Sequence, residues 1–208
     1  MMEAWQEFWR LFDKGGFVMP LLLAGSLLTV AVAVERFRVF RRATAGADVM
    51  REKLAALLTA GDWAAALAAA RQYENFAAQI AAAGLSQPER GSRAAELAME
   101  GAASRGAARL RQRLDLMNLI VTLAPLLGLL GTVIGMIRSF SVLNLRSGQP
   151  FAITGGVGEA LVATAAGLCV AVLSLVLLAY FRNRLDGILN DAEETAALIL
   201  QALAERQP

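Results

Sequence analysis

Residues 122–140 read TLAPLLGLLGTVIGMIRSF, and this stretch decides the fold of the chain. It is nearly all apolar, yet it contains a proline, three glycines and hydroxyl side chains. Gly131 and Gly135 are four residues apart and Gly128 lies about one turn earlier, a spacing that lets helix backbones approach closely inside a membrane. Pro125 lacks a backbone donor, so neighbouring helices or water must satisfy the carbonyl that it leaves free. We therefore expect a membrane helix with a close-packed side, and we expect Gly131 and Gly135 to support assembly of an oligomer.

Two further stretches share this apolar character. The chain of 208 residues is 57% hydrophobic with a mean hydropathy of +0.50, and residues 17–34, 116–137 and 160–181 carry no charge. Each run is about long enough to cross a hydrocarbon core of roughly 30 Å at 1.5 Å per residue. The core helices of a soluble all-helical protein, which is the alternative, rarely exclude charge over such lengths. The sequence predicts an all-α integral membrane protein with three transmembrane helices.

The composition argues against several classes of function. Histidine is absent, and the single cysteine, Cys169, lies within the third run. This excludes a disulfide framework and a histidine-based acid–base pair, and we expect no metal site and no cofactor. Paired carboxylates, a phosphate-binding loop and a nucleophile–base pair are also missing, so we expect no enzymatic activity. The net charge of +2 is too small to predict nucleic-acid binding.

The arginines indicate the topology. Four of them follow the first run closely, namely Arg36, Arg38, Arg41 and Arg42, whereas acidic residues offset Arg10 and Lys14 before it. Arg182 and Arg184 follow the third run. By the positive-inside rule, the N-terminus lies outside and both arginine clusters lie in the cytoplasm.

These features divide the chain into seven parts. An amphipathic helix with Trp5, Phe8, Trp9 and Phe12 on one face is expected to lie at the membrane interface, the alternative being a helix packed on the protein itself. We expect this interfacial helix over 1–14, transmembrane helices over 15–35, 116–140 and 158–181, a cytoplasmic helical region over 36–115, an outer loop over 141–157, and a cytoplasmic C-terminal helix over 182–208.

The cytoplasmic region should be built of several helices. Segments at 47–59, 63–73, 76–84 and from Arg93 onward are separated by glycine, asparagine and proline breaks. No proline stands between Arg93 and the second run, so we expect one uninterrupted helix there. The third run should likewise continue almost to the C-terminus, so that the second and third transmembrane helices extend into the cytoplasmic region.

Two threonines are the candidates for an ion path. Thr132 lies near the outer end of the second run and Thr164 near the outer end of the third, so antiparallel helices place both at about the same depth. Gly167 and other small residues share the face of Thr164. A membrane threonine taken singly is more often bonded to a carbonyl of its own helix, but two at one depth on small-residue faces favour a role in transport. Glu159, one turn from Thr164, is either functional or a marker of the water interface.

The sequence resembles a known family at these residues. The runs TLAPLLGLLGTVIGMIRSF and GEALVATAAGL are similar to the two signature segments of the MotA/TolQ/ExbB proton-channel family, and GGFVMPLLLAGSLLTVAVAVERF resembles its first span. Three spans make the TolQ and ExbB types the closer relatives, since flagellar stator subunits have four. The resemblance implies a bacterial inner-membrane protein with a periplasmic N-terminus and a cytoplasmic C-terminus.

The resemblance also implies a function and partners. It implies a homopentamer around two transmembrane helices of a small ExbD- or TolR-like partner, with proton flow coupled to work on the cell envelope through a TonB- or TolA-like protein. In the family pattern, Thr132 and Thr164 line the ion path beside an aspartate of the partner, and Glu159 is the glutamate of the second segment.

The residues independently indicate that a titrating group is missing. None of the three runs contains Asp, Glu, His or Lys, and hydroxyls can relay a proton but do not hold the charge near neutral pH. Another chain must therefore supply that group. Two alternatives stay open: a membrane scaffold that moves no ions, and a sodium-coupled motor, since hydroxyls and carbonyls also suit a hard cation.

Overall fold

The computed structural model describes residues 15–87, 91–145 and 151–206, together with Met2, Gln6 and Phe12. The side chains of residues 142–145 and 151–155 and that of Glu159 are outside the description. Every regular element in the described part of the chain is a helix, as predicted. Most of the interfacial helix expected over 1–14 lies outside the described residues and stays a prediction. The loop expected over 141–157 is wrong in its bounds, because residues 141–145 and 151–157 are helical and only residues 146–150 lie outside the described residues.

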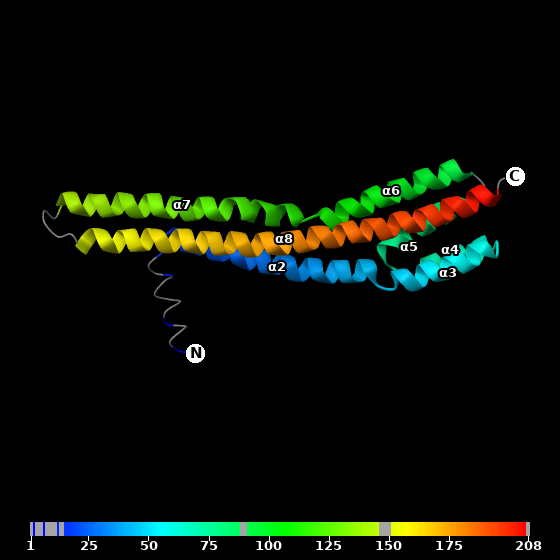
Figure 1. The fold of residues 1–208 in the computed structure, drawn as a ribbon, viewed down its shortest axis with the longest axis horizontal. Coiled ribbons are helices and arrows are strands. Elements are labelled where there is room, and N and C mark those ends of the chain that lie inside the picture. The colour runs from blue at the N-terminus through cyan, green and yellow to red at the C-terminus, as the bar shows by residue number, and fades with distance from the viewer. Residues whose placement is uncertain are drawn as a thin grey trace. The chain divides into compact units, whose positions relative to one another are not determined.

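Three helices are long and apolar (Figure 1). They are α2 (Val18–Thr44), α7 (Leu114–Leu145) and α8 (Phe151–Arg206). The helical stretches Val18–Thr59, Ser92–Ser141 and Gly156–Arg206 each contain a window apolar enough to cross a membrane, and only 28% of each window is buried inside the chain. Most of this apolar surface therefore needs lipid or another protein to cover it. The prediction of three apolar helices long enough to span a membrane is confirmed.

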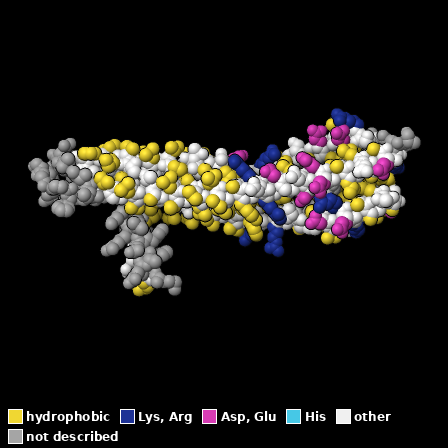
Figure 2. Space-filling model, in the orientation of Figure 1, with side chains coloured by type: hydrophobic (Ala, Val, Ile, Leu, Met, Phe, Trp, Pro, Cys, Tyr) yellow, Lys and Arg dark blue, Asp and Glu magenta, His cyan; other side chains and the backbone are white. Residues whose placement is uncertain are grey.

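The chain divides into two compact units, which we describe separately. Unit 1 comprises Met1–Ala33 and Arg113–Ala179, and unit 2 comprises Val34–Gln112 and Tyr180–Pro208. On the face shown in Figure 2, hydrophobic side chains dominate unit 1, whereas Lys, Arg, Asp and Glu gather over unit 2. This contrast follows the sequence, in which the three charge-free runs belong mainly to unit 1.

Unit 1 is a bundle of three helical segments. The first part of α2, all of α7 and the first half of α8 lie side by side (Figure 1). Their shared core joins residues of all three segments: Val18, Met19, Leu22, Ile120, Ala124 and Ala171. The core side of each segment is thus apolar and includes small residues, which allows close packing.

Unit 2 packs four shorter helices with the C-terminal part of α8. These are α3 (Ala47–Thr59), α4 (Trp63–Arg71), α5 (Phe76–Leu85) and α6 (Ser92–Arg111). Asp62 and Asn75 cap α4 and α5, since their side chains accept the backbone amides of Ala65 and Ala78 at 2.9 and 2.8 Å. These local capping signals explain why the sequence placed the helix starts correctly.

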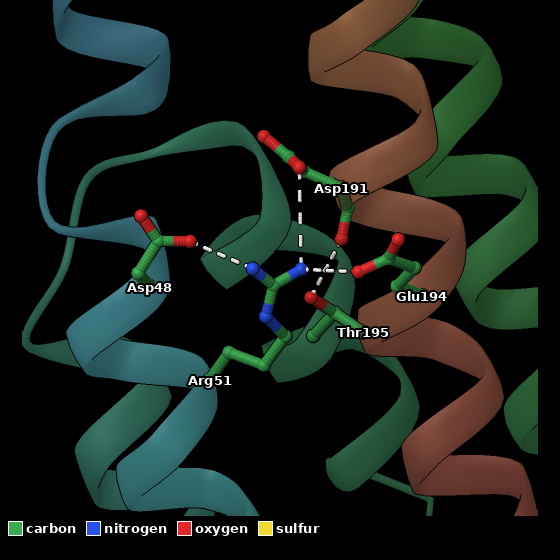
Figure 3. A network of polar contacts seen from close by, with 5 residues as sticks. All are labelled: Asp48, Arg51, Asp191, Glu194 and Thr195. Atoms are coloured by element: carbon green, nitrogen blue, oxygen red, sulfur yellow. Dashed lines mark hydrogen bonds and ion pairs between the residues drawn. The ribbon is translucent and has the colours of Figure 1, made fainter.

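A cluster of charged groups connects α3 with α8 inside unit 2 (Figure 3). The Arg51 guanidinium contacts Asp48 at 2.7 Å, Glu194 at 2.5 Å and Asp191 at 4.0 Å. The Thr195 hydroxyl donates to the backbone carbonyl of Asp191 at 2.8 Å. Because the carboxylates are largely exposed, we expect only a modest contribution of this cluster to stability.

One prediction about the second long helix is wrong. Instead of running on from Arg93, the helix breaks at Gln112 and Arg113, where Gln112 is extended (ψ 136°) and Arg113 has a φ of 70°. By contrast, α8 is unbroken over its 56 residues, as predicted. Neither glycine nor proline marks the break.

Arg36 of α2 provides the physical reason for this break. Arg36 is only 4% exposed, and its guanidinium donates to the carbonyls of Arg109 and Leu110 at 3.3 Å each. In an unbroken helix these two carbonyls would accept the amides of residues 113 and 114. The buried cation takes over both acceptors, and it also suits the negative end of the dipole of α6.

Candidate functional site at the interface of α7 and α8

The glycines of α7 lie directly against small residues of α8. A Cβ atom built on Gly131 would lie 2.5 Å from the Cβ of Ala163, and one on Gly135 would lie 3.0 Å from the Cβ of Ala160. Both distances are shorter than ordinary van der Waals contact. Larger side chains at these two glycines would therefore push the helices apart.

Gly128 and Gly167 bring the two backbones still closer. A Cβ on Gly167 would lie 2.5 Å from the carbonyl oxygen of Ala124 and 3.0 Å from the Cα of Gly128. A Cβ on Gly128 would lie 3.1 Å from the Cα of Thr164. The interface is thus tightest around Gly128, which is also where a threonine of α8 arrives.

This contact corrects one expectation about the oligomer. Gly128, Gly131 and Gly135 are covered by α8 of the same chain. The expectation that Gly131 and Gly135 join two copies is therefore wrong, because no room is left for another helix at this face. Contacts between copies need another surface.

Thr164 makes a hydrogen bond across the interface. Its hydroxyl donates to the carbonyl of Gly128 at 3.0 Å, and the side chain is half-buried. The contacts of Ala160 with Gly135 and of Ala163 with Gly131 set the antiparallel register. In that register Thr132 and Thr164 differ in level by about two residues, or roughly 3 Å.

Thr132 behaves differently from Thr164. Its hydroxyl donates to the carbonyl of Leu129 in its own helix at 2.6 Å. The half-buried residue lies beside an exposed apolar surface of α7 that includes Val133, Met136 and Ile137. The two threonines lie at similar depth but do not bond to each other in the single chain.

The remaining predicted residues are placed as follows. Pro125 is half-buried within α7, which continues through it. Glu159 precedes Ala160 in α8, and its side chain is outside the described residues. The structure therefore brings Thr164 and the four glycines together, with Pro125 in the same helix as three of them.

Sequence reasoning missed a buried pair of hydroxyls between α2 and α8. The Thr29 and Ser174 hydroxyls are 2.9 Å apart, and both residues are 0% exposed. Ser174 belongs to the small-residue face of the third run, but its partner is 145 positions away. The only available signal was a hydroxyl residue in the largely apolar first run, which contains both Ser26 and Thr29.

The chemistry of this interface is limited to hydroxyls and backbone carbonyls. Among the described residues, no three His, Cys, Asp or Glu side chains gather in a way that could hold a metal ion. Hydroxyls can donate and accept hydrogen bonds and can relay a proton. They need a titrating group beside them to hold one.

The three long apolar helices are those of a membrane protein, and their interface of small residues and hydroxyls is typical of packed transmembrane helices. The chain belongs to the MotA/TolQ/ExbB proton channel family, whose profile matches residues 72–194. The resemblance seen in the sequence is therefore confirmed. The family is one of channels and not of enzymes.

Individual relatives agree with this assignment. The chain is 38% identical over 176 residues to the ExbB-like 1 protein of Synechocystis sp.. The aligned part covers 80% of this chain and 67% of that protein. It is 28% identical over 187 residues to an ExbB homolog of Methanothermobacter thermautotrophicus, covering 88% of this chain and 66% of that protein. A segment of 61 residues is 46% identical to the biopolymer transport protein exbB1 of Vibrio cholerae, covering 28% of this chain and 27% of that protein. The chain thus spans about two thirds of the first two relatives.

Proposed function

We propose that this chain is the channel subunit of an inner-membrane motor that couples the proton motive force to mechanical work on the cell envelope. The observation that carries the proposal is the hydroxyl of Thr164, which bonds across a charge-free helix interface to Gly128 in a member of a proton channel family. A hydroxyl there can exchange its hydrogen bond with a passing proton carrier. Thr132, at similar depth, would act beside it.

The motor requires a second protein. The three apolar runs offer no group that titrates near neutral pH, so a small ExbD- or TolR-like partner with one span would supply an aspartate. Thr132 and Thr164 would hydrogen-bond to this carboxylate, and Glu159 would exchange protons with water at the outer edge. The available driving force is about 2.3 kcal/mol per charge for each 100 mV, which is ample to change a helix contact.

The proposed assembly is a homopentamer around two partner helices. The N-terminus and residues 141–157 would be periplasmic, and residues 36–115 and 182–208 cytoplasmic, as the arginine distribution indicates. A TonB- or TolA-like protein would receive the movement and carry it across the envelope. The large exposed apolar surface of the single chain supports contacts with both lipid and further protein chains.

Proton flux into liposomes tests the proposal. The parent and four variants, Thr132→Ser, Thr132→Val, Thr164→Ser and Thr164→Val, are reconstituted with the partner under an imposed membrane potential. Serine keeps the donor and acceptor and should retain most of the flux. Valine keeps the shape but removes the hydroxyl, which costs roughly 1–3 kcal/mol and should lower the flux by about fivefold to somewhat over a hundredfold.

Thr122→Val is the matched control for this measurement. Thr122 lies on the same helix, is exposed, and bonds to the carbonyl of Asn118 in its own helix at 3.2 Å. Its replacement should leave the flux unchanged. If both Val variants at Thr132 and Thr164 conduct like the parent in intact complexes, the hydroxyl path is wrong.

A scaffold that moves no ions is the second candidate. The bond from Thr132 to its own helix favours this structural role. The scaffold hypothesis predicts that the parent complex shows no proton flux. It also predicts that valine packs at Thr132 and Thr164 at least as well as serine does. Repeating the flux measurement with sodium in place of a proton gradient separates a sodium-coupled motor from a proton-coupled one.

A further inference from the structure

A small pocket in unit 2 has aromatic walls. Its volume is about 180 Å³, and Phe37, Phe40, Tyr180 and Phe181 form most of its lining. Phe40 and Phe181 are 2% exposed and meet edge to face with ring centroids 5.6 Å apart. Tyr180 packs edge to face on Phe181 at 5.3 Å. These contacts fix the shape of the pocket before any ligand arrives.

The rim of this pocket is positively charged. Arg41 and Arg184 line it from α2 and α8, and both are exposed. Neither guanidinium has an ion pair or a hydrogen bond within the described part of the chain, and no carboxylate is among the residues that line the pocket. Thr44, which also lines it, donates its hydroxyl to the carbonyl of Phe40. The rim thus offers two unsatisfied cations to an anion.

The pocket lies where two apolar runs end. Phe37 follows the last residue of the first run by three positions, and Tyr180 and Phe181 are the last two residues of the third run. Phe37 and Tyr180 remain 55% and 51% exposed. Exposed aromatic rings followed by arginines are typical of the level of the lipid headgroups on the cytoplasmic side.

We propose that this pocket binds one anionic phospholipid. The phosphate lies between Arg41 and Arg184, whose planar guanidinium groups suit phosphate oxygens, and the acyl chains lie against the exposed rings of Phe37 and Tyr180. A zwitterionic lipid would bring its cationic headgroup toward two arginines with no acidic residue in the lining to receive it. The aromatic walls select a lipid over free phosphate. The inference requires only that the chain lies in a membrane, so it stands or falls independently of proton conduction.

Binding of phosphatidylglycerol to the purified full-length protein in neutral detergent tests the inference. Native mass spectrometry counts the lipids retained per chain during a titration, with phosphatidylcholine as the zwitterionic comparison. The parent should retain one phosphatidylglycerol and bind it at least tenfold more tightly than phosphatidylcholine. Arg41→Gln and Arg184→Gln should each weaken this binding about fivefold, and the double variant about 25-fold.

The matched control is the double variant Arg38→Gln/Arg42→Gln. These arginines lie on the same helix at the same level, are exposed, and are not among the residues that line the pocket. Their replacement should change the affinity less than twofold. An equal loss of phosphatidylglycerol affinity in this control would show that general surface charge, and not the pocket, attracts the lipid. That result would overturn the inference.

Two comparisons use the parent protein alone and do not depend on the folding of variants. Equal affinity for phosphatidylcholine would overturn the inference, since the two arginines would then not select the anion. Glycerophosphoglycerol, which has the same headgroup without acyl chains, should not displace the lipid at millimolar concentration. Displacement by it, or by inorganic phosphate, would show a phosphate site without lipid selectivity and would equally overturn the inference.

Discussion

The hydroxyl of Thr164 donates to the carbonyl of Gly128 at 3.0 Å, from one apolar helix to another. In the register of α7, that carbonyl also faces the backbone amide of Thr132. The two threonines of the candidate ion path therefore meet at one carbonyl oxygen, although their hydroxyls do not bond to each other. A glycine at this position allows the approach, since a Cβ on Gly128 would lie 3.1 Å from the Cα of Thr164.

The two threonines should differ in their effect on stability. Thr164→Val removes a bond between helices and should lower the free energy of unfolding by about 0.6 kcal/mol, and by no more than about 1.7. Thr132→Val removes only a bond within α7 and should leave the free energy of unfolding nearly unchanged. Thermal unfolding in detergent measures both, with Thr122→Val as the control. A larger loss for Thr132→Val would show that this hydroxyl has a partner in the assembled complex.

The close contact of Gly131 with Ala163 predicts a compensating pair of substitutions. Gly131→Ala places a Cβ 2.5 Å from the Cβ of Ala163 and should destabilise unit 1 by about 1–3 kcal/mol through overpacking. Adding Ala163→Gly moves the methyl group to the opposite helix and should recover most of the loss. Thermal unfolding of both single variants and the double variant measures the coupling.

The control for this pair is Gly158→Ala, since a Cβ there meets nothing within 4 Å. It should be neutral or slightly stabilising, because alanine is the better helix former. If Gly131→Ala is equally well tolerated, the register of α7 against α8 is incorrect.

The buried hydroxyls of Thr29 and Ser174 predict non-additive substitutions. Thr29→Val leaves the Ser174 hydroxyl without its partner in a fully buried position and should cost about 1–3 kcal/mol. The double variant Thr29→Val/Ser174→Ala removes both polar groups and should be closer to the parent than the sum of the single variants. Strict additivity of the unfolding free energies would show that the two hydroxyls do not interact.

The sequence predicted those features of the fold that depend on local signals. The charge-free runs predicted the three apolar helices. The breaks expected between the cytoplasmic segments coincide with the starts of α4 and α5, where the structure shows Asp62 and Asn75 as caps. The break at Arg113 was missed because its cause, Arg36, lies more than 70 positions away in the chain.

The sequence also predicted one part of the candidate site and missed another. The small residues of the second and third runs indicated a close interface, and the structure places Gly128 and Thr164 in it. The pair of Thr29 with Ser174 was missed because it depends on which helix face meets α2, and a single threonine carries no such information. The glycine face was expected both to meet the third run and to support an oligomer, because sequence spacing cannot tell a partner copy from the next helix of the same chain.

Arg36 should stabilise the junction that follows α6. Arg36→Met keeps the apolar stem but removes the donors to the carbonyls of Arg109 and Leu110, which should cost about 1–3 kcal/mol. Arg38→Met, at an exposed position of the same helix, is the control and should cost little. Hydrogen exchange of the amides of residues 111–115 should speed up in the Arg36 variant alone. Unchanged exchange there would mean that the break in the helix does not depend on this arginine.

The topology proposed from the arginines can be tested with cysteine labelling. In a Cys169→Ala background, single cysteines are placed at Ser147, in the loop expected outside, and at Ser92, at the start of α6 in unit 2. A membrane-impermeant thiol reagent added to intact cells, after permeabilisation of the outer membrane, should label the first and spare the second. Lysed cells provide the control that both cysteines can react. The physical reason is the excess of arginine after the first and third runs, which the positive-inside rule keeps in the cytoplasm. Labelling at Ser92 but not at Ser147 would reverse the orientation, and with it the side from which Glu159 exchanges protons.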